Sequence, residues 1–393
     1  MTVTTRSAGA PMLRALFVNS GLRFGGAETQ LIEIIKELRR RGHDVALYLL
    51  TRHAPRAAEL TAVGVRVIAD NKRVKLDPCV LARMRRFVAS WKPDLLHGFL
   101  FDANIYARLA GWGQGVVVLN SERSQGYRLT LQQRLIQSAT RAMVDGVIAN
   151  SHTGCAFAQE TFGYALQRSD TVWNGVDLPT IDARIAASST DYRRQWFEAS
   201  DVKLAVIVGT IKPEKDPLLA LDVAERLIDR DPRWRVVFVG AAYATSLRGG
   251  ADKIQASTAL EARVRERLVV SPHASSILFV GQRNDALEII AAADVLYSTS
   301  RREGFPNVVL EAMSVGTPVV TTEYSDIMQI LPDTRFVFAS RDPVALAEGI
   351  IEADRRRLDI GRQMRAWVER HATIERSVDA LLSVYGRYLA EPH

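Results

Sequence analysis

From Leu13 onward, the chain alternates short runs rich in β-branched residues with segments of helical hydrophobic spacing, in two successive series. Parallel strands need a long crossover between them, so this alternation is typical of parallel sheets covered by helices on both faces. Expected strands lie at residues 14–19, 45–50, 65–68, 95–97, 116–119, 146–149 and 171–173 in the first series, and at 203–208, 235–239, 276–280, 295–298, 318–321 and 336–338 in the second. The sequence therefore predicts an α/β fold with two doubly wound, Rossmann-like domains.

The domain boundaries follow from length and composition. The 393 residues exceed what one hydrophobic core usually serves, which favours two domains. A stretch rich in Ala, Ser, Thr and charges, from Thr180 to Asp201, interrupts the alternation. We therefore expect a disordered lead-in at 1–11, an N-terminal domain at 12–185, a C-terminal domain at 186–360, and helices at 361–393. Two such domains would place their strand carboxyl edges face to face, with the ligand cleft between them.

Charge is shared unevenly along the chain, whose net charge is +7. Residues 1–180 carry 23 Lys and Arg against 14 Asp and Glu, whereas the remainder carries 28 against 30. A basic first half favours anionic partners such as nucleic acid, lipid headgroups or a phosphorylated acceptor. No window approaches the roughly 20 apolar residues that span a bilayer, and residues 1–11 lack the apolar segment of a secretory signal. Two distant cysteines, Cys79 and Cys155, fit the reduced thiols of a cytoplasmic protein.

One segment carries most of the chemical information. Glu303 and Glu311 stand eight positions apart across a turn that opens a helix. Pro306 suits the first helical turn, and Gly304 permits backbone geometry that other residues avoid. The free N–H groups expected at Asn307, Val308 and Val309 favour an anion such as a diphosphate. Glu311, two turns inside the helix, can accept hydrogen bonds from a vicinal diol such as a ribose. The candidate donor-binding residues here are Gly304, Phe305, Asn307, Val308, Val309 and Glu311, with Glu303 as a catalytic candidate.

A glycine-containing loop follows the first strand of each series. Gly25 and Gly26 precede a helix, where backbone amides approach a phosphate or a polarised oxygen closely. In the second series, a turn at Gly209 leads to Lys215, whose ammonium would balance the negative charge that grows on a departing diphosphate. His97 ends the strand at 95–97, on the edge where doubly wound sheets place chemistry, although an isolated histidine there is usually structural.

These motifs resemble those of a known family. The segment from Glu303 to Val320 resembles the E-x7-E signature of retaining glycosyltransferases of the GT-B fold, in particular the large GT4-type family. The loop at 25–28 resembles that family's GGAE loop, and the loop at 209–217 its G-R-x-x-x-x-K element with Lys215 as the lysine. The resemblance covers roughly residues 13 to 355 and implies a GT-B fold, in which the C-terminal helices at 361–393 cross back to the N-terminal domain.

The same resemblance implies roles for single residues. The GGAE loop would contact the donor's diphosphate and the acceptor, and His97 would lie near the transferred sugar. Thr210 stands where the family usually has an arginine, so that Lys212 or Arg301 would have to supply the missing charge. We expect no metal and no cofactor, the nucleotide sugar being a substrate.

The resemblance implies an enzyme that moves a sugar from a nucleoside-diphosphate sugar to a hydroxyl with retained configuration. The acceptor is expected to be lipid-linked or phosphorylated, in polysaccharide or glycolipid synthesis at the cytoplasmic membrane face. A nucleotide-sugar 2-epimerase of the same architecture is an alternative, since it would need the same donor site. A nucleic-acid-binding protein, favoured by the pI near 9.5, is a further alternative but lacks any binding motif.

Overall fold

The structure is a computed structural model that describes residues 12–23, 25–123, 129–242 and 251–391, except for the side chains of 251–253. The expected lead-in at 1–11 lies outside these residues. The chain divides into two units: unit 1 comprises Met1–Asn174 with Ile374–His393, and unit 2 comprises Gly175–Thr373.

Unit 1 contains a parallel sheet whose described strands follow the order β3-β2-β1-β4-β5-β6-β7. The strands are β1 (Arg14–Asn19), β2 (Asp44–Leu49), β3 (Arg66–Ala69), β4 (Leu95–Phe99), β5 (Val117–Glu122), β6 (Gly146–Ala149) and β7 (Ser169–Thr171), and the helices are α1 (Gly26–Arg40), α2 (Ala57–Thr61), α3 (Pro78–Trp91), α4 (Phe101–Gly111), α5 (Leu131–Thr140), α6 (His152–Phe162) and α16 (Ile374–Ala390). Short 3-10 turns lie at Arg141–Met143 and Leu166–Arg168.

Unit 2 contains a second parallel sheet with the order β10-β9-β8-β11-β12-β13 among its described strands. Its strands are β8 (Lys203–Val208), β9 (Trp234–Val239), β10 (Ile277–Gly281), β11 (Val295–Ser298), β12 (Val319–Thr322) and β13 (Val337–Phe338), and its helices are α7 (Leu178–Ala186), α8 (Tyr192–Phe197), α9 (Pro217–Arg230), α10 (Ala251–Val269), α11 (Ala286–Ala292), α12 (Asn307–Ser314), α13 (Ile327–Ile330), α14 (Pro343–Arg355) and α15 (Arg357–His371). Both units are therefore doubly wound and Rossmann-like, as the sequence predicts.

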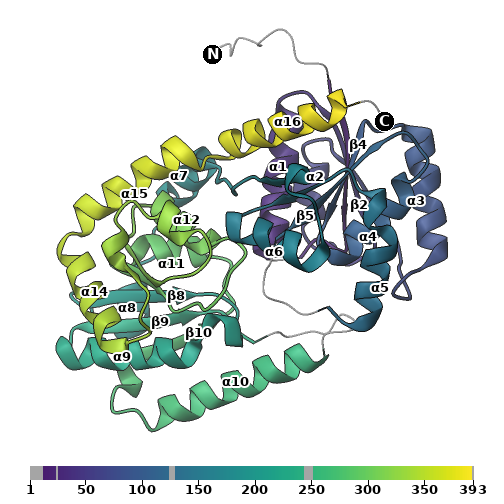
Figure 1. Cartoon of the computed structure of the whole chain (residues 1–393). Helices are drawn as coiled ribbons and strands as arrows, with labels where there is room; N and C mark the ends of the chain where they lie inside the picture. The colour runs from purple at the N-terminus through teal and green to yellow at the C-terminus, as the bar shows by residue number, and fades with distance from the viewer. Residues whose placement is uncertain (1–11, 24, 124–128, 243–250, 392–393) are drawn as a thin grey trace, which may run out of the picture. The chain divides into compact units, whose positions relative to one another are not determined.

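Helices cover both faces of the sheet in unit 1. On one face, apolar residues of α1 and α16 pack together with inward residues of β1, β2 and β4. On the other face, α3, α4 and α6 pack against the alternate residues of the same strands. Figure 1 shows α16 beside α1, and Arg41 at the end of α1 donates to Asp379 of α16 at 2.5 Å. Successive side chains of each strand point to opposite faces of the sheet, so each strand contributes to two separate hydrophobic cores.

The division between the units differs from the expected boundary at residue 185. The polar stretch from Thr180 to Asp201 contains α7 and α8 and belongs to unit 2, where Arg184 of α7 forms an ion pair with Glu288 of α11 at 2.6 Å. At the other end, α15 packs on α12 within unit 2, and only α16 joins unit 1. Contacts within unit 2 therefore hold α7 and α15 in place, and composition alone does not reveal these contacts.

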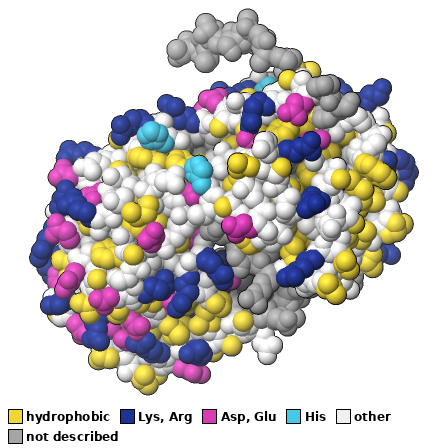
Figure 2. Space-filling view, viewed as in Figure 1, with side chains coloured by type: hydrophobic (Ala, Val, Ile, Leu, Met, Phe, Trp, Pro, Cys, Tyr) yellow, Lys and Arg dark blue, Asp and Glu magenta, His cyan; other side chains and the backbone are white. Residues whose placement is uncertain are grey.

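Exposed apolar side chains gather in one part of unit 1. Leu131 and Leu135, one turn apart on α5, are 73% and 63% exposed, and Val74 and Leu76 of the segment before α3 are 54% and 41% exposed. The two elements are joined by a hydrogen bond from Lys75 Nζ to Gln132 Oε1 at 3.3 Å. We call Val74, Leu76, Leu131 and Leu135 the α5 patch. Figure 2 shows hydrophobic and basic side chains over the region of α3 to α5.

The close approach of α15 to the end of α12 depends on two glycines. A Cβ added to Gly361 would lie 2.2 Å from the carbonyl oxygen of Gly316, which is backbone and cannot move aside easily. By contrast, Gly386 in the middle of α16 has open space around the position of a Cβ.

We therefore expect Gly361→Ala and Gly386→Ala to have opposite effects on stability. Gly361→Ala should destabilise the protein by about 1–3 kcal/mol through overpacking. Gly386→Ala should stabilise it by about 0.5–1 kcal/mol, because alanine loses less backbone entropy on helix formation. Melting temperatures of the two variants and the parent test this, and a stabilised Gly361→Ala variant would contradict the close approach.

Candidate functional site

The candidate site in unit 2 lies where the strand order reverses, between β8 and β11. The loops after these two strands leave the carboxyl edge of the sheet side by side, because β8 and β11 are hydrogen-bonded neighbours. A cavity of about 30 Å³ there is lined by Gly209, Thr210, Lys215 and Val308, among others. Gly209 has φ +153°, and a Cβ on it would lie 3.0 Å from Cε of Lys215. Four candidates from two separate segments thus meet at this edge.

Glu303 and Lys215 form the centre of this site. Their Oε1 and Nζ atoms lie 2.5 Å apart, and the hydroxyl of Ser300 donates to the same Oε1 at 2.8 Å. Burial alone would raise the pKa of Glu303, but the positive charges of Lys215 and Lys212 hold that pKa below its ordinary value. Burial likewise opposes the charge of Lys215, and Glu303 raises its pKa. The pair is therefore ionised.

Thr210 supplies no positive charge to the site, and Lys212 and Arg301 are the two candidates to supply that charge instead. The structure places these two side chains differently. The Arg301 guanidinium is 58% exposed and pairs with the carboxylate of Asp216 at 2.6 Å. The Lys212 ammonium has no hydrogen-bond or ion-pair partner among the described residues, and its charge acts on Glu303. Lys212 is thus the substitute with a charge available at the site.

The start of α12 differs in detail from the expectation of three unbonded amides. The Asn307 N–H donates to the Phe305 carbonyl at 3.0 Å, and the Val309 N–H donates to the Pro306 carbonyl at 2.9 Å. The backbone turns tightly at Pro306, so these amides find acceptors in the same turn. Of the three, Val308 alone has an N–H without a backbone acceptor in the described part of the chain.

Gly304 and Phe305, in the loop before α12, also differ from what the sequence predicts. Gly304 is not among the residues with positive φ, so the expectation of special backbone geometry there is wrong. Its carbonyl accepts a hydrogen bond from the Ser325 hydroxyl at 2.9 Å. The side chain of Phe305 is 6% exposed and belongs to the packed interior of unit 2. Both residues therefore shape the loop through contacts within the protein.

Glu311 carries a carboxylate without a partner. It lies on α12, and the structure gives this carboxylate no hydrogen bond or ion pair with any described residue. Burial raises its pKa to about 7, against the opposing effects of the cations Arg184 and Lys215. A desolvated carboxylate of this kind is suited to accept hydrogen bonds from hydroxyl groups of a ligand.

In unit 1, Gly25 and Gly26 lie at the start of α1, as expected. Both are exposed, and Gly25 is the N-cap residue with no side-chain cap. A Cβ on Gly25 would lie 2.5 Å from Oε2 of Glu28, so the carboxylate folds back over this helix start. Burial raises the pKa of Glu28, which Arg23 and Arg56 oppose. The loop thus combines open backbone with a partly desolvated acid.

His97 lies in the interior of unit 1 rather than at an open edge. Its side chain is fully buried, with Nδ1 2.6 Å from the Tyr385 hydroxyl and Nε2 2.8 Å from the Ser121 hydroxyl. Burial, and then the charge of Arg123, lower its pKa well below the ordinary value, so the imidazole is neutral. Both ring nitrogens are occupied, and a contact with a sugar stays a prediction.

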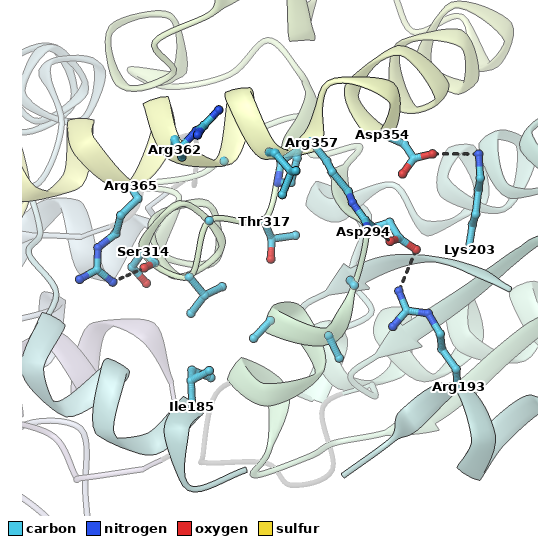
Figure 3. A pocket seen from close by; sticks show the side chains of 18 of the residues that line it. Ile185, Arg193, Lys203, Asp294, Ser314, Thr317, Asp354, Arg357, Arg362 and Arg365 are labelled. Carbon is cyan, nitrogen blue, oxygen red and sulfur yellow. Dashed lines mark hydrogen bonds and ion pairs between the residues drawn. The ribbon is translucent and has the colours of Figure 1, made fainter. Parts of the chain in front are cut away.

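A second, larger hollow in unit 2 lies away from this site. It has a volume of about 1430 Å³ and lies at the opposite, amino-terminal edge of the sheet, where Lys203 begins β8 and Asp294 precedes β11. Figure 3 shows that its cations meet the protein's own oxygens: Lys203 pairs with Asp354 at 2.9 Å, and Arg193 pairs with Asp294 at 2.8 Å. We assign no ligand to this hollow.

Sequence reasoning missed Ser300, Ser121 and Tyr385. Ser300 orients Glu303, and the other two hold the imidazole of His97. A serine three residues before a glutamate carries no distinctive signal. Tyr385 is 288 positions from His97 in the sequence, so only the packing of α16 against β4 reveals this pair.

Comparison with known proteins gives consistent results for both units. The family model described as "Glycosyl transferases group 1" matches residues 188–367, and the model "Glycosyltransferase Family 4" matches residues 24–179. A D-inositol 3-phosphate glycosyltransferase of Geodermatophilus obscurus is 29% identical over 68% of this chain and 58% of its own length. A phosphatidyl-myo-inositol mannosyltransferase of Mycobacterium tuberculosis is 26% identical over 83% of each chain.

Solved structures show the same fold. The Anabaena protein HepE, crystallised in complex with UDP-glucose, superimposes with a TM-score of 0.76 at 19% identity, over 95% of this chain and 99% of its own. At that identity, the likeness concerns the fold.

The raised pKa of Glu311 predicts a pH-dependent cost to stability. A carboxyl whose pKa is higher in the folded state favours folding at low pH, and this contribution is lost as pH rises from the unfolded value, near 4.5, through about 7. We therefore expect Glu311→Gln to be more stable than the parent by roughly 1–3 kcal/mol at pH 8, with the difference shrinking toward pH 5. Melting temperatures across this range test it, with Glu288→Gln as a control for loss of a carboxylate that is paired. A difference that does not change with pH would contradict the burial of Glu311.

Proposed function

This chain belongs to the group 1, or GT4-type, glycosyltransferases, and we propose that it transfers a sugar from a nucleoside-diphosphate sugar to an acceptor hydroxyl with retained anomeric configuration. The observation that carries this proposal is the ionised Glu303–Lys215 pair at the strand-order reversal of unit 2, with Lys212 and the Val308 amide beside it. Doubly wound sheets bind nucleotides at this place.

The charges of the site suit the bond that breaks. As the bond between the anomeric carbon and the diphosphate oxygen breaks, negative charge grows on the diphosphate and positive charge on the sugar ring. Lys215, Lys212 and the Val308 N–H would stabilise the diphosphate, because preorganised donors act most strongly in a partly desolvated site. Glu303 lies beside the same ammonium, and its carboxylate would stabilise the positive ring.

The bond that forms would lie on the same face of the sugar. The acceptor oxygen attacks the anomeric carbon from the side of the departing diphosphate, and its proton passes to a phosphate oxygen. This route needs no protein nucleophile of the kind that retaining glycosidases use. Glu311 would accept hydrogen bonds from the ribose hydroxyls, since its carboxylate has no partner within the described structure.

Unit 1 would supply the acceptor side. The open backbone at Gly25 and Gly26 would approach the diphosphate and the acceptor. His97 would act as a positioning residue, because its imidazole fixes the Ser121 hydroxyl, and a direct contact with sugar would require Nε2 to exchange that partner.

We propose no role for a metal ion, since the lysines carry the charge and the chain's D-x-D, Asp229-Arg230-Asp231, lies before β9 at the amino-terminal edge of the sheet, away from this site. Turnover is accordingly expected to persist in EDTA, and its loss in EDTA with recovery on adding a divalent ion would overturn this part.

The acceptor is proposed to be lipid-linked, with the enzyme at an anionic membrane surface. The relatives named above include one that acts on phosphatidyl-myo-inositol. In unit 1, the α5 patch combines exposed leucines with the neighbouring Lys75 and Arg134, which is the composition of an interfacial docking surface. No helix of the described residues is long and apolar enough to cross a bilayer.

Turnover of single variants tests the catalytic proposal. Glu303→Ala and Glu303→Gln should lower kcat by orders of magnitude, and Lys212→Ala should lower it roughly 10²-fold, as removal of one charge-stabilising group does. Arg301→Ala, the matched control, should have a small effect, because that guanidinium is exposed and paired with Asp216. Release of nucleoside diphosphate gives the rate, and NMR of the product gives the anomeric configuration. Near-normal activity of both Glu303 variants would remove the central assignment.

Thermal-shift screening with a panel of nucleotide sugars identifies the donor first, since a ligand that binds the folded protein raises the protein's melting temperature. Incubation with the donor alone separates transfer from epimerisation. An epimerase changes the sugar without an acceptor, whereas the proposed transferase forms a glycosidic bond only when an acceptor is present.

Liposome sedimentation tests the membrane proposal. At low salt we expect the parent to bind vesicles that contain anionic lipid, and Leu131→Ser with Leu135→Ser to bind several-fold less, because apolar area is lost from the interface. Leu166→Ser is the matched control, since Leu166 is 70% exposed elsewhere in unit 1. Equal binding of all three proteins, or indifference of the parent to anionic lipid, would rule out docking through the α5 patch.

A further inference from the structure

Buried polar atoms without hydrogen bonds gather along one edge of unit 1. Among the described residues, the buried side-chain atoms that have no partner are Oδ1 of Asn19, Asn104 and Asn150, Nε of Arg123, and Nε1 of Trp234 in unit 2. Each of the first four side chains is at least nine-tenths buried. Leaving such an atom unbonded costs roughly 1–3 kcal/mol, so a native protein that does so repeatedly in one place needs an explanation.

The four atoms of unit 1 share a location in the fold. Asn19 ends β1, Arg123 follows β5, Asn150 follows β6, and Asn104 lies on α4 just after β4. These four strands are consecutive in the sheet. Because all strands are parallel, their carboxyl ends form one edge, and this edge is where doubly wound sheets bind ligands. The unmet polar groups therefore lie along the edge of the sheet that binds ligands, and each atom is covered by protein in this structure.

Arg123 is the unusual member of this set. Its guanidinium donates to Asn174 Oδ1 at 2.8 Å and to Ser121 Oγ at 3.3 Å, and it lies 4.7 Å from the centre of the Phe99 ring. No described carboxylate forms an ion pair with it. Burial lowers the pKa of Arg123 to about 10, which leaves the group charged at neutral pH. A buried cation that contacts only neutral groups costs free energy, and an anion bound beside it would reduce that cost.

A second buried arginine of the same unit shows what a structural arginine looks like. Arg108 donates to Gln137 Oε1 at 2.8 Å, to Thr140 Oγ1 at 3.0 Å and to the Tyr164 hydroxyl, and the negative charge of Glu122 favours it. Burial lowers the pKa of Arg108 as it does that of Arg123, but the negative charge of Glu122 opposes this effect at Arg108, and no described carboxylate does so at Arg123.

We propose that the carboxyl edge of the unit 1 sheet binds an acceptor that carries an anionic group beside its hydroxyls, with the anionic group paired to Arg123. The asparagine oxygens would accept hydrogen bonds from the hydroxyls, and the planar guanidinium would bind a phosphate ester or a carboxylate. His97 supports this arrangement, since it fixes the same Ser121 hydroxyl that Arg123 contacts. The inference rests on the proposed function and specifies the chemical class of its acceptor.

Stability measurements separate this role from a structural one. Arg123→Met removes a buried charge that lacks a counter-ion, so the melting temperature should fall little or rise. Arg108→Met removes a compensated arginine and should lower the melting temperature by several degrees. If Arg123→Met destabilises the protein as much as Arg108→Met does, Arg123 is structural and the proposal fails.

Binding measurements use pairs of probes that differ in charge. Calorimetric titration of the full chain compares D-inositol 3-phosphate with myo-inositol, glucuronate with glucose, and inorganic phosphate with chloride. The parent should bind at least one anionic probe more tightly than its neutral counterpart, and Arg123→Met should reduce that preference roughly 10- to 100-fold, the usual effect of losing a hydrogen bond to a charged group. A phosphate preference alone identifies an ester and a glucuronate preference an acidic sugar. An unchanged preference in Arg123→Met, or none in the parent, overturns the proposal.

A separate measurement keeps this inference distinct from the proposed function. Nucleotide sugars should raise the melting temperatures of the parent and of Arg123→Met equally, because the donor site lies in unit 2. If none stabilises the parent, the proposed function fails; if they stabilise both proteins and the anion preference is unchanged, only the role of Arg123 fails.

Discussion

The reversal of strand order beside the first strand of each sheet determines where chemistry is possible in this protein. In unit 1, the chain leaves β1 toward β2 and β3 and then returns to β4 on the other side of β1. The helices that follow β1 and β4 therefore pack on opposite faces, α1 in one core and α4 in the other. The loops at their starts must diverge, which opens the carboxyl edge at that point. In unit 2, the strand order reverses in the same way between β8 and β11. This reversal places the loop of Lys215 beside the loop of Glu303.

The ionised pair at that edge is a charge arrangement that stability does not require. Two partly buried charges give up hydration, and their attraction offsets this loss only when the geometry is good. Here the oxygen and nitrogen lie 2.5 Å apart and Ser300 holds the carboxylate, so the geometry is good. Eight positions later, Glu311 has burial without a partner, and its pKa rises instead. Glu303 thus has a lowered pKa and Glu311 a raised pKa, although both lie on one short segment. This difference suits two different functions.

Much of the fold could be predicted because hydrophobic periodicity is local. The strands β1, β6, β8 and β11 begin and end where the sequence predicts, since β-branched runs bounded by turn residues leave few alternatives. The helices α7 and α8 were missed, because their Ala, Ser, Thr and charged residues carry a weak signal and contacts with unit 2 stabilise them. Propensity loses to tertiary packing in such segments.

The site was predictable in its residue types and less so in its details. The spacing of Glu303 and Glu311 and the position of Lys215 are sequence properties, and the structure brings Glu303 and Lys215 together. Which amides of α12 stay unbonded depends on the backbone at Pro306, which no spacing encodes. The surroundings of His97 depend on Tyr385, from the far end of the chain. Likewise, the choice between Lys212 and Arg301 required knowing that the arginine is exposed and pairs with Asp216.

The Glu303–Lys215 pair of unit 2 and the unbonded groups at the edge of unit 1 differ in how fully they are satisfied, and this difference has a consequence for binding. In unit 2, Glu303 and Lys215 compensate each other, so a ligand there gains only what its contacts add beyond an existing ion pair. In unit 1, the unbonded oxygens at Asn19 and Asn150 and the unpaired guanidinium of Arg123 raise the free energy of the ligand-free state. A ligand that satisfies them recovers that free energy. Recognition in unit 1 should therefore discriminate sharply, since a molecule that lacks the matching donor or charge leaves buried groups unmet.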